Sequence, residues 1–120
     1  MHIIVTGGLG HIGSHLILQL IKKNKNYKIT VFDSLLTNRY ATLFMFAKYK
    51  NIKFIEKDLS KSNIDTYVKN TNLVIHLAAI TDAQSSILIP EKIESNNLQT
   101  TKNITKSCAK YKKNLIFISS

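Results

Sequence analysis

All four glycines of this 120-residue chain lie within one short stretch: Gly7, Gly8, Gly10 and Gly13. Glycines that only filled loops would be spread along the chain, so the cluster marks a place where a side chain would be in the way. An apolar stretch at residues 2–6 precedes the cluster, and an apolar pattern with helical spacing follows it. This context predicts that Gly7 makes a tight turn, that Gly10 lets the backbone approach a pyrophosphate, and that Gly13 lets a helix pack against the strand. A plain tight turn is the alternative.

Apolar strand-like runs alternate with helix-length segments along the rest of the chain. The patterns predict strands over residues 2–6, 28–32, 52–55, 73–77 and 115–119, and helices over residues 12–23, 38–49, 61–69 and 90–113. Such alternation predicts an α/β fold with a parallel sheet and helices on both faces. We expect a Rossmann-type sheet with strand order 3-2-1-4-5, truncated after strand five.

Asp33 ends the second predicted strand and follows Gly13 by 20 residues. A carboxylate at this point accepts hydrogen bonds from the ribose hydroxyls of a dinucleotide and repels a 2′-phosphate. The sequence therefore favours NAD over NADP, although Arg39 lies near enough to receive a 2′-phosphate. The alternative for Asp33 is a residue that only stabilises a turn or caps a helix.

Composition excludes several classes of protein. Hydrophobic residues make up 44% of the chain and the formal net charge is +10, which is compatible with an ordinary globular domain. The lysines are scattered and no aromatic residues interleave with them, so we expect no nucleic-acid partner. No apolar run is long enough to span a membrane, no secretory signal is recognisable, and Cys108 is the only cysteine. We therefore expect a cytoplasmic protein without a disulfide or a metal site.

The segment Thr6–Leu16, TGGLGHIGSHL, resembles the opening of the extended short-chain dehydrogenase/reductase family, which contains the NAD-dependent sugar epimerases and dehydratases. Five further segments resemble family motifs in the same order: VFDSL (31–35), FIEKDL (54–59), VIHLAA (74–79), NLQTT (97–101) and FISS (117–120). The likeness covers the whole chain, and the UDP-glucose 4-epimerase-like members resemble it most.

The motifs and the resemblance together imply a set of NAD-binding residues: Gly7, Gly10, His11, Ile12, Gly13, Asp33, Ser34, Asn38, Asp58, Leu59, Leu77, Ala78, Ala79 and Asn97. In the family the aspartate equivalent to Asp58 meets the adenine, and the strand end at 77–79 lies along the cofactor. The alternatives are a helix cap for Asp58 and a helix-surface amide for Asn97. For His76 we favour a buried, hydrogen-bonded histidine over a cofactor contact.

The resemblance also says which catalytic residues to expect. The family uses a serine or threonine followed by a Tyr-x-x-x-Lys motif on a later helix, and only the first position, Ser120, lies within this chain. Tyr111 is not a substitute, because the residue four positions later is Leu115. We therefore expect residues 1–120 to be an incomplete NAD-binding domain, without the catalytic helix and the substrate domain, and without turnover by itself.

The parent enzyme would be a homodimer that acts on a nucleotide sugar by transient hydride transfer to NAD. The alternative is a non-catalytic dinucleotide-binding module or a degenerate remnant.

Overall fold

A computed structural model describes residues 1–35, 40–78 and 90–118 of the chain. Five parallel strands form one sheet in the order β3-β2-β1-β4-β5, as the sequence predicts. The strands are β1 (His2–Thr6), β2 (Lys28–Asp33), β3 (Ile52–Glu56), β4 (Leu73–His76) and β5 (Asn114–Phe117), and the helices are α1 (His11–Lys23), α2 (Tyr40–Phe46), α3 (Asp65–Lys69) and α4 (Pro90–Lys110).

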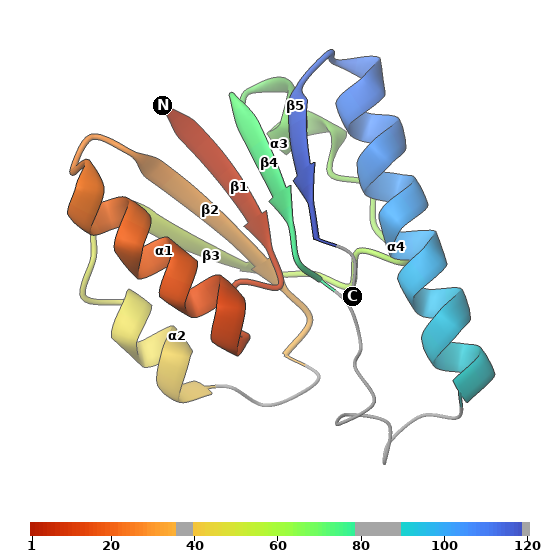
Figure 1. Ribbon diagram of the computed structural model, residues 1–120, viewed down its shortest axis with the longest axis horizontal. Helices are drawn as coiled ribbons and strands as arrows, with labels where there is room; N and C mark the ends of the chain where they lie inside the picture. Colours follow the sequence, from red (N-terminus) through yellow and green to blue (C-terminus); the bar gives the residue numbers. More distant parts are fainter. Residues whose placement is uncertain (36–39, 79–89, 119–120) are drawn as a thin grey trace.

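Helices cover both faces of the sheet (Figure 1), with α1 and α2 on one face and α3 and α4 on the other. The strands alternate between two buried clusters, because successive side chains of a strand point to opposite faces. Ile3 and Val5 of β1 join the cluster under α1, whereas Ile4 joins the cluster under α3 and α4. Both faces of the central strands are therefore buried, which accounts for their continuous apolar sequences.

Three of the predicted helices, at α2, α3 and α4, are shorter than expected. We predicted a helix over residues 61–69, but α3 begins only at Asp65, because the Asn63 side chain accepts the Asp65 N–H at 2.7 Å and forms a local turn. We predicted a helix over residues 38–49, but α2 ends at Phe46. Beyond it, the N–H groups of Lys48 and Tyr49 donate to the carbonyl three residues earlier instead of four. Residues 38 and 39 lie outside the described part.

The C-terminal end of α4 was also predicted incorrectly, at about residue 113 instead of Lys110. Lys112 adopts a left-handed conformation with φ of 54°. The Lys113 N–H then donates to the Cys108 carbonyl at 2.9 Å, and the Lys112 N–H donates to the Ala109 carbonyl. This is the Schellman motif that closes many helices, with lysine at the position where glycine is usual.

Replacing the exposed Lys112 with glycine should therefore stabilise the protein by roughly 0.5–1 kcal/mol, because glycine adopts a left-handed conformation without steric cost. Urea denaturation would measure the free energy of unfolding. The matched control is Lys113→Gly, which adds glycine without relieving a left-handed residue and should lower stability. A loss of stability in Lys112→Gly would contradict the strain assigned to this position.

β5 forms the edge of the sheet beside β4, and its side chains are poorly covered. Ile116, Phe117 and Ile118 are each about half exposed, at 49%, 50% and 50%. Leu115 alone packs into the cluster under α4. An apolar edge strand of this kind favours association between chains.

Candidate cofactor site

The carboxyl ends of β1, β2, β3 and β4 meet at one edge of the sheet, where most of the predicted site residues lie. The glycine turn follows β1, Asp33 ends β2, Asp58 follows β3, and Leu77 follows β4. In Figure 1 the loop from β1 to α1 lies at this edge together with the end of β2. Open α/β sheets bind their ligands at such an edge, beside the point where the strand order reverses.

Gly7 and Gly13 are required by packing. Gly7 has a φ of +70°, and a Cβ atom there would lie 2.8 Å from the backbone of Ala78 and Leu77. A Cβ atom on Gly13 would lie 2.6 Å from the Gly7 carbonyl oxygen. These glycines let the turn pass close to the segment that follows β4 and let α1 pack against the turn, in agreement with the roles predicted for them.

Gly10 lies in a different environment. A Cβ atom there would have only the Gly7 carbonyl oxygen within 4 Å among the described residues, at the ordinary contact distance of 3.4 Å. Gly10 is the N-cap of α1, which begins without a side-chain cap and has no acidic residue in its first turn. His11 and Ile12 are exposed. The open Gly10 backbone and the positive end of the helix dipole fit a pyrophosphate.

Asp33 joins the glycine turn to the end of β2. Its carboxylate accepts a hydrogen bond from the Leu9 N–H at 3.2 Å and another from the Leu35 N–H at 3.0 Å. Among the described residues, each oxygen has one backbone donor, which leaves acceptor positions for further hydrogen bonds because a carboxylate has about four. The exposed Ser34 follows directly. Asp33 thus stabilises a turn and also keeps capacity for ribose hydroxyls, so the two interpretations of this residue are compatible.

Asp58 and Leu59 form a segment that α4 holds in place. Asp58 accepts hydrogen bonds from the Ser60 N–H at 3.0 Å and the Ser60 hydroxyl at 2.6 Å. The Asn96 amide donates to the Ser60 hydroxyl at 3.0 Å, and the Asn103 amide donates to the Leu59 carbonyl at 2.8 Å. The Leu59 side chain is buried in the cluster under α4. Leu59 can therefore meet a ligand only through its backbone.

A buried polar network joins β1 to β4 beside the glycine turn. The Thr6 hydroxyl accepts hydrogen bonds from the Leu77 and Ala78 N–H groups, each at 3.1 Å. Since both its lone pairs are used, its proton is donated to His76 Nδ1, 2.7 Å away. His76 is therefore neutral, with its proton on Nε2, which faces the Thr101 hydroxyl at 3.3 Å. Burial lowers the pKa of His76 to about 4.

The structure thus gives His76 a buried, hydrogen-bonded position, as we predicted. The sequence interpretation missed Thr6 as the residue that positions this segment. In the sequence, Thr6 is marked only as a polar residue at the end of an apolar strand. It also missed Asn96 and Asn103, which lie at helical spacing on one side of α4 and form a polar stripe that the sequence could have indicated.

Not every predicted site residue can be placed. Asn38, Ala79 and Ser120 lie outside the described residues. Asn97 is half-buried on α4, and α4 covers the face opposite α1. Within the described ranges, no cluster of three or more His, Cys, Asp or Glu side chains could hold a metal ion.

No helix in the described part of the chain is long and apolar enough to cross a bilayer. The fold and the glycine turn define a Rossmann-type α/β domain of the dinucleotide-binding class. Comparison with known proteins then gives the family. Residues 4–120 match the 3-beta hydroxysteroid dehydrogenase/isomerase family, and the chain belongs to this family.

The similar proteins are enzymes of nucleotide sugars. The chain is 36% identical over 123 residues to a dTDP-D-glucose 4,6-dehydratase of Dictyostelium discoideum, covering 98% of this chain and 28% of the relative. It is 34% identical over 126 residues to a UDP-glucose 4-epimerase of Bacillus subtilis, covering 100% of this chain and 37% of the relative. The chain thus spans about a third of the length of these curated relatives and matches their N-terminal part.

A solved epimerase structure also matches this chain over its whole length. The UDP-glucuronic acid 4-epimerase of Bacillus cereus, in complex with UDP-glucuronic acid and NAD, superposes with a TM-score of 0.84 at 27% identity. The superposition covers 100% of this chain and 40% of the epimerase chain. The expected resemblance to epimerases and dehydratases is therefore confirmed, as is the Rossmann-type fold with strand order 3-2-1-4-5.

Proposed function

We propose that this chain is the NAD-binding portion of a nucleotide-sugar epimerase or dehydratase. The observation that carries the proposal is the open Gly10 backbone at the uncapped start of α1, on the same edge of the sheet as Asp33. The likeness to an epimerase solved with NAD and a UDP-sugar supports this ligand class. When bound, NAD supplies the nicotinamide ring that accepts a hydride from a carbon of the sugar.

Each part of the edge has a proposed role toward NAD. The start of α1, at His11 and Ile12, binds the pyrophosphate through backbone N–H groups. Gly10, whose own N–H donates to the Gly7 carbonyl, leaves space for the pyrophosphate. Asp33 accepts hydrogen bonds from the ribose hydroxyls, with Ser34 and Asn38 beside it. Further along the cofactor we place Asp58 and Leu59 at the adenine, and Leu77, Ala78, Ala79 and Asn97 on the nicotinamide side.

For the whole enzyme we propose Ser120 as the hydroxyl that orients the sugar, beside a tyrosine base that this chain does not contain. The substrate would be a nucleotide sugar, and the enzyme would work as a homodimer in the cytoplasm. These proposals rest on the family resemblance.

Asp33 offers the most direct test of the cofactor. Replacing it with asparagine removes the negative charge of a carboxylate that accepts hydrogen bonds from the ribose hydroxyls and repels a 2′-phosphate. The affinity for NAD should therefore fall by about 10- to 100-fold. NADP affinity should not fall, which reduces the preference for NAD. Isothermal titration calorimetry with both dinucleotides measures the two constants.

The matched control is Asp65→Asn, the same chemical change on α3, away from the edge of the sheet. It should leave both affinities unchanged. An NAD preference that survives Asp33→Asn would contradict the role of this carboxylate, and failure of the native chain to bind NAD at all would contradict the proposed function.

A further inference from the structure

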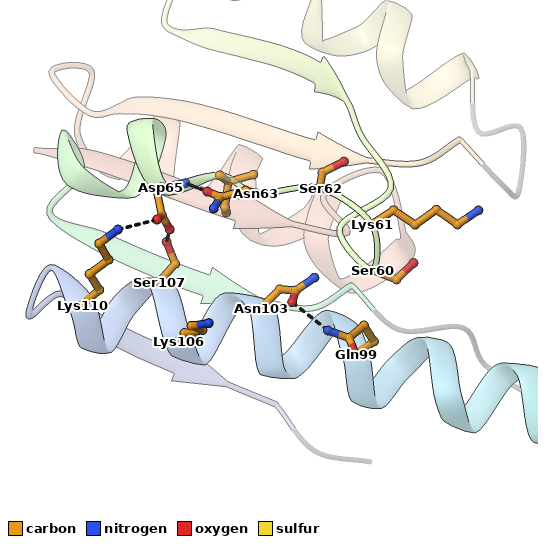
Figure 2. A pocket seen from close by; sticks show the side chains of 11 residues that line it. Ser60, Lys61, Ser62, Asn63, Asp65, Gln99, Asn103, Lys106, Ser107 and Lys110 are labelled. Atoms are coloured by element: carbon orange, nitrogen blue, oxygen red, sulfur yellow. Dashed lines mark hydrogen bonds and ion pairs between the residues drawn. The ribbon is translucent and has the colours of Figure 1, made fainter.

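A cavity lies apart from the glycine turn, between α4 and the segment that leads from Ser60 into α3. Its volume is about 470 Å³, within the usual range for small-molecule sites. Figure 2 shows polar side chains of both walls around it, with segment 60–65 on one side and α4 on the other. Ile64 is its one large apolar lining residue, and that side chain is buried in the core.

Hydrogen bonds between the two walls hold the cavity in shape. At one end, Ser107 and Lys110 of α4 converge on the Asp65 carboxylate (Figure 2), and the Lys110 Nζ–Asp65 Oδ2 distance is 3.0 Å. At the other end, the amides of Asn103 and Asn96 bind the backbone of Leu59 and the hydroxyl of Ser60. A site that is tied at both ends is already formed before a ligand binds, which reduces the entropy cost of binding.

The charges lining this cavity do not balance. The lining contains three lysines, Lys61, Lys106 and Lys110, and a single carboxylate, that of Asp65. Asp65 is already paired with Lys110, and the Ser107 hydroxyl occupies its other oxygen. Among the described residues, neither Lys61 nor Lys106 forms an ion pair. The described part of the lining therefore has two lysines beyond the one that Asp65 pairs with.

The polar groups that remain can bind a hydrophilic molecule. Asn63 uses its side-chain oxygen to accept the Asp65 N–H, and Gln99 donates from its amide nitrogen to Asn103 at 2.9 Å. No further hydrogen bond to these two amide groups is found in the described part of the chain, so the other end of each can pair with a ligand, since an amide side chain both donates and accepts. Lys106 lies between Asn103 and Ser107 on α4, whereas the Lys61 side chain extends outward at the mouth of the cavity (Figure 2).

We propose that this cavity binds a small phosphorylated molecule rich in hydroxyl groups. Lys106 binds the phosphate from α4, and Lys61 adds a second charge from the mouth. Asn63 and Gln99 pair with the hydroxyl groups. The volume accommodates more than a free phosphate ion, and the polar lining favours a sugar-like ligand over an apolar one. The site is distinct from the glycine turn and does not rest on the NAD assignment.

The test is a titration of the chain with glucose 6-phosphate, followed by amide chemical shifts in NMR spectra at constant ionic strength. We expect the shifts to concentrate on Asn63, Lys106 and Ser107, and glucose without its phosphate to leave them unchanged. Lys106→Glu should weaken binding at least about tenfold, since a charged hydrogen bond is replaced by repulsion.

Lys102→Glu is the matched control, because Lys102 is an exposed lysine of the same helix that does not line the cavity. It makes the same change in net charge and should keep the native affinity. An equal loss of affinity in both variants would overturn the proposal, because it would show that the ligand responds to the overall positive charge of the chain and not to this cavity. Shifts confined to residues 7–14, or no shifts at millimolar ligand, would also overturn it.

Discussion

Replacing Gly10 with valine should abolish NAD binding while the chain stays folded. A side chain at this position enters the open space that we assign to the pyrophosphate, and the expected loss of affinity is on the order of 100-fold or more. The folded state should tolerate the change, because Gly10 has an extended backbone (φ −69°, ψ 172°) that any residue adopts. Calorimetry with NAD measures the affinity, and circular dichroism reports whether the fold is kept.

Gly13→Val provides the contrast, since it makes the same substitution one helical turn further on. Its Cβ atom would lie 2.6 Å from the Gly7 carbonyl oxygen and 2.8 Å from Gly8 Cα. Because both contacts are with backbone, the turn and α1 must separate, and we expect a loss of about 3 kcal/mol or outright unfolding. Unchanged NAD affinity in folded Gly10→Val would refute the glycine-turn assignment.

These two glycines also show what sequence spacing can and cannot predict. The spacing of Gly7, Gly10 and Gly13 between a strand and a helix was enough to predict the turn and the class of ligand. The same spacing also assigned the turn to Gly7, the ligand space to Gly10 and the helix contact to Gly13, but it could not name the atoms that exclude a side chain. Those atoms depend on the direction of each missing Cβ, and for Gly7 they belong to Leu77 and Ala78, which follow β4 far later in the chain.

The sheet could be predicted more fully than the helix ends. Strand order follows from the alternation of strands and helices and from the right-handed crossover rule, which do not depend on individual side chains. Helix ends depend on local hydrogen bonds that compete with the helix, such as the Asn63 turn before α3. They also depend on backbone conformations such as the left-handed Lys112 after α4, where no glycine marked the end.

Long-range polar contacts were the least predictable part of the site. The apolar sequence around His76 indicated burial, but not the partner, because Thr6 is 70 residues away in sequence. The same holds for Asn103, whose amide binds the Leu59 carbonyl 44 residues away. Such pairs exist only once β1, β4 and α4 are packed together, so one sequence shows the residues but not their pairing.

The buried His76 should make the stability of the protein depend on pH. In the unfolded chain its pKa is near the ordinary value of 6.5, whereas burial lowers the pKa in the folded protein to about 4. Between these values the unfolded state binds a proton that the folded state excludes, so acid favours unfolding. The free energy of unfolding should fall by about 3 kcal/mol as the pH drops from 6.5 to 4, at about 1.4 kcal/mol per pH unit. Urea titrations at several pH values measure it.

The variant His76→Asn separates this effect from other acid sensitivity. Asparagine places a side-chain oxygen close to the position of Nδ1, so it can still accept the Thr6 proton, but it cannot become charged. The variant should lose the pH slope above about pH 4.5, whatever its overall stability. Asp65 does not add to the pH slope above about pH 4.5. The Ser107 hydroxyl and Lys110 hold the pKa of its carboxyl below the ordinary value of 3.8, so its protonation affects stability only at lower pH. His15→Asn, which changes an exposed histidine of α1, should keep the slope. If His76→Asn retained the native slope, or if the native protein lost no stability down to pH 4.5, the Thr6–His76 pair could not be the buried neutral contact that joins β1 to β4.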